Sequence, residues 1–215
     1  MSTLFHYWGA GGPLMLPLAA LCFGMWLWMV AVHVELSRAN ASSRGLHDLL
    51  HGLTGDGLPG AVRDWATANP GPAARAASYA LASGPNGDAA RGRVDEARSV
   101  EIPRFEREIL VLIAMVAAAP LLGLLGTVMG MIDTFAVLSV RGTATMKLLS
   151  VGISEALVTT QVGLVVALPG VVGAALAARR LSGLRATFDR LELHLSSRLA
   201  GRGLASAAAS RGGRH

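Results

Sequence analysis

The sequence predicts an all-α membrane protein with three transmembrane helices. Only 15% of its 215 residues are charged, against about 25% in a typical globular protein. Three runs contain no charged residue at all, namely residues 1–34, 109–132 and 156–178. Each run holds an apolar stretch close to the ~20 residues that a helix needs to cross a bilayer. This pattern excludes a soluble enzyme.

The first predicted span covers residues 13–34 and follows a short segment, residues 1–12. That segment contains no Lys or Arg, and the apolar run is longer than that of a signal peptide, so we predict a retained span. Pro17 lies in its first turns, where a missing N–H costs least. Beyond Glu35 the helix is expected to continue to about residue 51.

Residues 35–108 form the large loop after the first span. From residue 52 onward the loop is rich in Ala, Gly and Pro, with helix-forming stretches at 61–68 and 73–82. It has too few large apolar residues to bury a core alone, so we predict a small helical insert. His47 and His51 are spaced i, i+4, but no Cys or third ligand is near in sequence. We therefore expect neither a metal site nor a cofactor.

The second and third spans are predicted at residues 109–140 and 148–178, joined by a short connector at 141–147. A helix over 104–140 would be about 55 Å long, which exceeds the membrane thickness, so it should protrude. A helical extension follows at 179–200, and a disordered basic tail at 201–215. Within the extension, a heptad-like stripe with spacings of 3, 4, 3 and 4 should pack on another helix or subunit; it consists of Leu181, Leu184, Phe188, Leu191 and Leu195.

The distribution of Lys and Arg predicts the orientation in the membrane. Residues 1–34 hold no Lys or Arg, the 35–108 loop holds nine, residues 133–155 hold two, and the chain from Arg179 onward holds eight. With three spans the two termini lie on opposite sides, so we predict the N-terminus outside and the C-terminus in the cytoplasm. The arginines of the tail suit contact with anionic lipid headgroups. No aromatic residues are interleaved with them, so we do not expect nucleic-acid binding.

The second span contains polar and small residues in place of a purely apolar surface. Gly126 and Gly130 form a small-xxx-small pair that allows close helix approach, and Pro120 and Gly123 precede them. Thr127 and Thr134 are seven residues apart and share a helix face. Their hydroxyls could line a polar path, or each could bond back to a carbonyl of its own helix.

The third span carries one acid, Glu155, about 12 Å along the helix from Lys147. An ionisable group at this depth costs several kcal/mol unless it faces protein or water. Thr159 and Thr160 follow it, with Gly163 and Pro169 further along. Two helices with hydroxyls and one acid suit a proton path; the alternative is that Glu155 extends to the outer interface. Three helices cannot enclose a path, so a homo-oligomer or a partner helix is required.

The second and third spans resemble the MotA/TolQ/ExbB proton-channel family. The resemblance rests on the runs Ala119-Pro120-x-x-Gly-Leu-x-Gly-Thr-Val-x-Gly-Met-Ile and Gly152-Ile-x-Glu-Ala-Leu-x-Thr-Thr-x-x-Gly-Leu-x-x-Ala-x-Pro169. It extends to Gly-Gly-Pro-Leu-Met at 11–15 and to the three-span topology, and covers about half of the chain.

The resemblance implies a proton-channel subunit of the bacterial inner membrane, with a periplasmic N-terminus. Five copies would surround the helices of an ExbD/TolR-like single-span partner, which carries the proton-accepting aspartate, and a TonB/TolA-like protein would receive the work. By the same resemblance, Thr127 and Thr160 line the pore and Glu155 is the acid of the third helix. Three spans favour the ExbB/TolQ branch over the four-span flagellar stators. Within it we favour ExbB and keep TolQ as the alternative.

Two functions of other classes remain as rivals. Gly152-Ile153-Ser154 has the G-x-S pattern of a serine nucleophile, but a hydrolase needs a base within reach of the serine, and residues 109–178 contain no His. A structural scaffold would keep the glycines and the heptad stripe but would have no use for Glu155 and the threonines. We therefore predict that the protein is not an enzyme.

Overall fold

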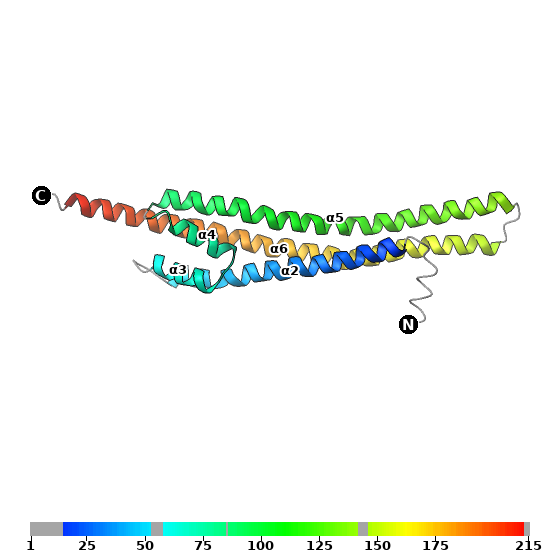
Figure 1. Ribbon diagram of the computed structural model, residues 1–215, viewed down its shortest axis with the longest axis horizontal. Coiled ribbons are helices and arrows are strands. Elements are labelled where there is room, and N and C mark those ends of the chain that lie inside the picture. The colour runs from blue at the N-terminus through cyan, green and yellow to red at the C-terminus, as the bar shows by residue number, and fades with distance from the viewer. Residues whose placement is uncertain (1–14, 53–57, 85, 142–145, 213–215) are drawn as a thin grey trace. The chain divides into compact units, whose positions relative to one another are not determined.

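A computed structural model of the chain describes residues 15–52, 58–84, 86–141 and 146–212. All regular elements among these residues are α-helices, which confirms the predicted all-α fold class (Figure 1). They are α2 (Met15–Gly52), α3 (Leu58–Ala68), α4 (Pro72–Leu81), α5 (Gly87–Arg141) and α6 (Met146–Gly212).

Three of these helices, α2, α5 and α6, are long and apolar enough to cross a membrane. Between 22% and 33% of the residues in their most apolar windows are buried inside the chain. Most of the apolar side chains in these windows therefore face outward, which costs free energy in water but none in lipid. This arrangement fits a multi-pass membrane protein.

The chain divides into two compact units, and the three long helices contribute to both. The first unit comprises Met1–Ala31 and Ile109–Leu176, and the second Val32–Glu108 and Ala177–His215. The first unit contains nearly all of the three charge-free runs, and the second contains most of the charged residues.

The first unit has a core in which α2 packs against the other two long helices. Met25, Leu112 and Val116 are buried there, together with smaller side chains such as Ala167 and Ala174. The absence of a side chain at Gly170 makes room for α2, because a Cβ at that position would lie 2.7 Å from the Met25 sulfur.

The second unit buries the predicted heptad stripe of α6. The five stripe residues, 181, 184, 188, 191 and 195, are at most 4% exposed, which confirms that this face packs against protein. α3 and α4 confirm the predicted short helices of the loop. They pack on each other and bury Val62 and Trp65 of α3 and Ala73 and Ala77 of α4.

Two helix boundaries differ from the prediction. α5 begins at Gly87 rather than near residue 104, because the Asn86 side chain accepts hydrogen bonds from the N–H groups of Asp88 and Ala89, both at 3.1 Å, and so caps the helix. α6 continues to Gly212, so the prediction of disorder is wrong for residues 201–212. Alanine, the strongest helix former, recurs through this stretch.

Candidate functional site: the contact between α5 and α6

In the first unit, α5 and α6 touch through small side chains. The buried residues on the two facing surfaces follow a spacing of three and four, as expected for helices that pack along one stripe. They are Ala119, Gly123 and Gly126 on α5, and Ala156, Thr159 and Gly163 on α6. Small residues at these positions bring the two backbones close together.

Gly123 of α5 and Gly163 of α6 lie where the two backbones come close together. A Cβ added to Gly163 would lie 2.8 Å from the carbonyl oxygen of Ala119 and 3.2 Å from Cα of Gly123. A Cβ at Gly126 would lie 2.5 Å from the Thr159 hydroxyl oxygen, whereas one at Gly130 would meet nothing nearer than 3.5 Å. The two glycines of the predicted small-xxx-small pair thus both face α6, Gly126 in tight contact and Gly130 at ordinary van der Waals distance.

The hydroxyls of Thr159 and Thr160 of α6 lie near the Gly123 carbonyl of α5. The Thr160 hydroxyl donates to that oxygen at 3.2 Å. The Thr159 hydroxyl donates to the Ala156 carbonyl of its own helix at 2.8 Å and approaches Gly123 O at 3.5 Å. Thr159 is only 3% exposed, whereas Thr160 is partly exposed. Thr160 thus combines a bond across the two helices with access from outside the contact.

The two threonines of α5 bond back to their own helix. The Thr127 hydroxyl donates to Leu124 O at 2.7 Å, and the Thr134 hydroxyl to Gly130 O at 2.6 Å. The sequence left open whether these hydroxyls line a polar path or bond back to a carbonyl of their own helix, and the structure has the second arrangement. Thr134 also packs on Gly152 of α6, a contact residue that the sequence analysis did not single out.

Glu155 lies on the same helix as Thr159 and Thr160, but its side chain is outside the residues that the structure describes. The backbone places it one turn before Thr159. Pro120 and Pro169 are accommodated within α5 and α6 and are partly buried. A proline removes one backbone donor from its helix, which leaves a carbonyl of the preceding turn free for another partner.

The described side chains include no group of three or more His, Cys, Asp or Glu placed to hold a metal ion. The side chains of His47 and His51 lie outside the described set. Ser154 is exposed on α6.

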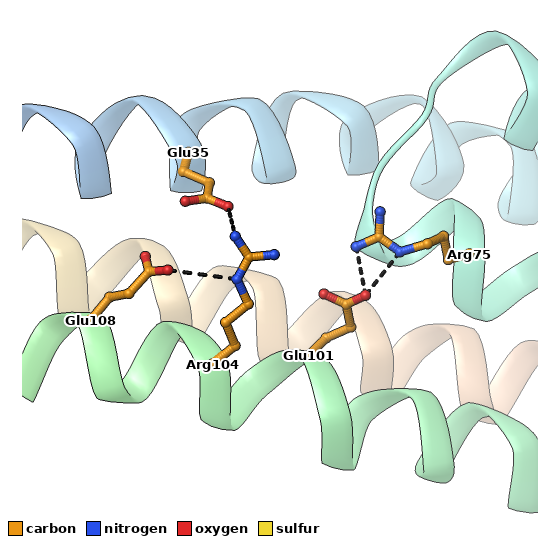
Figure 2. A network of polar contacts seen from close by, with 5 residues as sticks. All are labelled: Glu35, Arg75, Glu101, Arg104 and Glu108. Atoms are coloured by element: carbon orange, nitrogen blue, oxygen red, sulfur yellow. Dashed lines mark hydrogen bonds and ion pairs between the residues drawn. The ribbon is translucent and has the colours of Figure 1, made fainter.

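A charged layer in the second unit adjoins the ends of the charge-free runs. Figure 2 shows Arg104 of α5 reaching Glu35 of α2 at 2.5 Å and Glu108 of its own helix at 3.6 Å. In the same view, Arg75 of α4 pairs with Glu101 of α5 at 2.5 Å. The pairs Arg104–Glu35 and Arg75–Glu101 join segments far apart in the chain, which leaves no local sequence pattern, whereas Arg104–Glu108 has the i,i+4 spacing of a single helix.

Comparison with known proteins shows the family of the chain. Residues 69–190, more than half of the chain, match the model of the MotA/TolQ/ExbB proton channel family. The Tol-Pal system protein TolQ of Haemophilus influenzae is 38% identical over 72 residues, which are 34% of this chain and 32% of that protein. The biopolymer transport protein exbB1 of Vibrio cholerae is 40% identical over 92 residues, 40% of each chain.

The ExbB of Aquifex aeolicus is 39% identical over 85 residues, which are 35% of this chain and 57% of that protein. The chain thus spans between about a third and somewhat over half of the length of these curated relatives. The family consists of proton channel subunits rather than enzymes, which removes the serine hydrolase from consideration. With its three membrane-length helices and its matched region across α5 and α6, the chain belongs to the MotA/TolQ/ExbB proton channel family.

Proposed function

We propose that this chain is an ExbB-type proton-channel subunit, which uses the proton motive force to drive a TonB-like protein in outer-membrane uptake. Names among its relatives include biopolymer transport protein exbB1 and ExbB. The proton path would run along the α5/α6 pair, with Thr127, Thr134, Glu155, Thr159 and Thr160 as its polar groups.

The observation that carries this proposal is the hydrogen bond from Thr160 to the Gly123 carbonyl. It holds a partly exposed hydroxyl at 3.2 Å from a backbone oxygen of the neighbouring helix. A hydroxyl has one O–H donor and two acceptor lone pairs. When the bond to Gly123 O is released, the Thr160 hydroxyl could take a proton from water on its oxygen while its own proton passes to a carboxylate. Glu155 lies five residues earlier on the same helix, and in this proposal water links its carboxyl to the hydroxyl.

A single chain needs further helices to enclose such a path. We propose a homopentamer that surrounds the single spans of an ExbD/TolR-like protein, whose aspartate accepts the proton.

In this proposal the complex sits in the bacterial inner membrane, with the N-terminus in the periplasm. Residues 1–12 and 141–147 face the periplasm, whereas the 35–108 loop and the chain after residue 178 are cytoplasmic. The excess of Lys and Arg in these last two regions supports that orientation.

The test is proton flux through the chain, co-purified with its single-span partner and reconstituted in liposomes with an internal pH dye. Glu155→Gln and Thr160→Val should each lower flux by more than tenfold, while native mass spectrometry shows an unchanged oligomer. Thr187→Val is the matched control, since the Thr187 hydroxyl only bonds back to Gly183 O at 3.1 Å in the second unit. Wild-type flux in both Glu155→Gln and Thr160→Val would contradict the proton path and favour a scaffold.

The alternative is a TolQ-type subunit of the Tol-Pal envelope-integrity system, which the Haemophilus relative supports. Complementation separates the two roles. An ExbB-type chain restores TonB-dependent growth on iron chelates to a host lacking its own subunits, whereas a TolQ-type chain restores detergent resistance. In both assays the single-span protein from the neighbouring reading frame is supplied together with this chain.

A further inference from the structure

The three long helices carry charged residues at one common level of the second unit. Arg104 of α5 pairs with Glu35 of α2, and the Arg180 side chain of α6 donates to the His33 carbonyl and to the Ser37 hydroxyl of α2 at 3.2 and 2.9 Å. Arg185 of α6 pairs with a glutamate of α5, Glu106. These contacts place residues 33–40, 104–108 and 179–185 side by side.

This level also marks where the charge-free runs of the three helices end. Glu35, Glu108 and Arg179 are the first charged residues next to those runs. For helices that cross a membrane through these runs, this level falls at the lipid headgroups, since ~30 Å of hydrocarbon corresponds to about 20 helical residues. We call the three segments 33–40, 104–108 and 179–185 the boundary layer.

Positive charge exceeds negative charge in the boundary layer. It contains six arginines and three glutamates, a net charge of +3. Each glutamate has an arginine partner: Arg104 serves Glu35 and Glu108, and Arg185 serves Glu106. Two arginines, Arg104 and Arg185, thus pair with all three acids of this layer.

Three arginines are left over, one on each long helix: Arg38 of α2, Arg107 of α5 and Arg179 of α6. All three are exposed, and within the described part of the chain none of them has a hydrogen bond, ion pair or ring contact. An arginine presents a fork of N–H donors that matches the oxygens of a phosphate. The guanidinium groups of these three arginines are not paired with an acid of the described part of the chain. Lipid headgroups at this level would supply anions for them.

We propose that Arg38, Arg107 and Arg179 bind the phosphate groups of anionic phospholipids, and so give the protein a preferred shell of such lipids at this leaflet. The inference does not rest on the proton path, because it needs only a chain that crosses the membrane. The occupant is the headgroup of a lipid rather than a soluble phosphate, since the same unit exposes an apolar side chain, Val34 (42% exposed), next to Glu35 at the end of the charge-free run, where it offers contact to acyl chains.

The test is the selectivity of the full chain for anionic lipid in vesicles. Spin-labelled phosphatidylglycerol and phosphatidylcholine are compared in phosphatidylcholine vesicles, and the motionally restricted fraction of each label gives their relative association constant. The wild-type chain should prefer phosphatidylglycerol. Arg107→Gln/Arg179→Gln should lower the preference by about two- to fivefold for each arginine removed, whereas Arg107→Lys/Arg179→Lys should keep most of it.

The matched control is Arg63→Gln/Arg190→Gln, which removes the same charge from exposed arginines that likewise have no partner among the described residues. Arg190 lies about 16 Å beyond Arg179 along α6, farther than a Debye length at physiological salt. This variant should keep the wild-type preference. Equal binding of the two lipids by the wild-type chain, or an equal loss in both double variants, would overturn the proposal.

A further arm separates lipid phosphate from soluble phosphate. Inorganic phosphate and sodium chloride, added at equal ionic strength, should lower the lipid preference equally, because both act by screening. A larger loss with inorganic phosphate would mean that the arginines form a site for the soluble anion, and would overturn the assignment to lipid.

Discussion

The two units bury the same helix, α6, with different side chains. In the first unit its buried positions hold residues no larger than threonine, such as Ala156, Gly163 and Ala167. In the second unit the buried positions hold large apolar residues, such as Leu184 and Phe188, both fully buried. The spacing of three and four residues is the same in both units, so helical geometry is held constant while the size of the side chains changes.

The difference follows from the solvent around each unit. Helices in lipid gain little from burying a leucine, because lipid tails are equally apolar, so they associate through close backbone contact and interhelical hydrogen bonds. In water, burial of large apolar side chains supplies most of the favourable free energy. The buried residues of α6 thus change from small to large where the helix passes from one unit to the other. A smaller side chain should destabilise the second unit, whereas a larger one should destabilise the first.

The largest effect is expected from removing a large side chain in the second unit. Phe188→Ala leaves a cavity at a fully buried position and should lower the free energy of unfolding by about 3–5 kcal/mol. Thermal unfolding of the detergent-solubilised chain, followed by circular dichroism, measures the loss. Leu193→Ala, at a position 63% exposed, is the control and should change stability by less than about 0.5 kcal/mol. An equal loss of stability in Phe188→Ala and Leu193→Ala would show that burial of large side chains does not stabilise the second unit.

An intermediate effect is expected from adding one methyl group in the first unit. Gly163→Ala drives a Cβ against the backbone of Ala119 and Gly123, which neither helix can relieve by rotating a side chain, and should cost about 1–3 kcal/mol. Gly130→Ala adds the same group where the nearest atom is 3.5 Å away. It should be neutral or slightly stabilising. Equal unfolding temperatures for these two variants would show that the tight contact is not required.

The smallest effect is expected from the ion pairs at the surface of the second unit. Arg98 of α5 and Asp189 of α6 meet at 2.5 Å with side chains 35% and 52% exposed. Water screens such a pair, so Arg98→Gln should cost no more than about 1 kcal/mol. The loss should shrink further in 1 M salt. A larger loss that persists in salt would mean that electrostatics, rather than apolar burial, holds this unit together.

Periodicity in the sequence predicted the fold well. Charge-free runs located the three long helices, and the leucine and phenylalanine spacing located the buried face of α6. The N-terminus of α5 was missed because its signal is a single capping residue, Asn86, followed by Asp88 in the first turn. The helical end of α6 was missed because its residues lack an apolar stripe, although many of them favour a helix.

The candidate site was only partly predictable. The glycines were expected to pack, but how tightly each one packs depends on the relative rotation of α5 and α6, so the sequence could not separate the tight position Gly163 from the looser position Gly130. The same rotation decides that the Thr160 hydroxyl reaches across to Gly123 O whereas the Thr127 hydroxyl turns back to Leu124 O. A single helix pattern contains no information on its partner's rotation.

The contact between α2 and α6 in the second unit has a mechanical consequence. Arg180 of α6 donates to the His33 carbonyl of α2, while the Asn40 side chain of α2 donates to the Arg180 carbonyl at 2.9 Å. Each helix thus forms a hydrogen bond to the main chain of the other. Sliding of α2 along α6 by one residue, about 1.5 Å, would disturb both bonds together. These two segments should therefore move together as one stiff element.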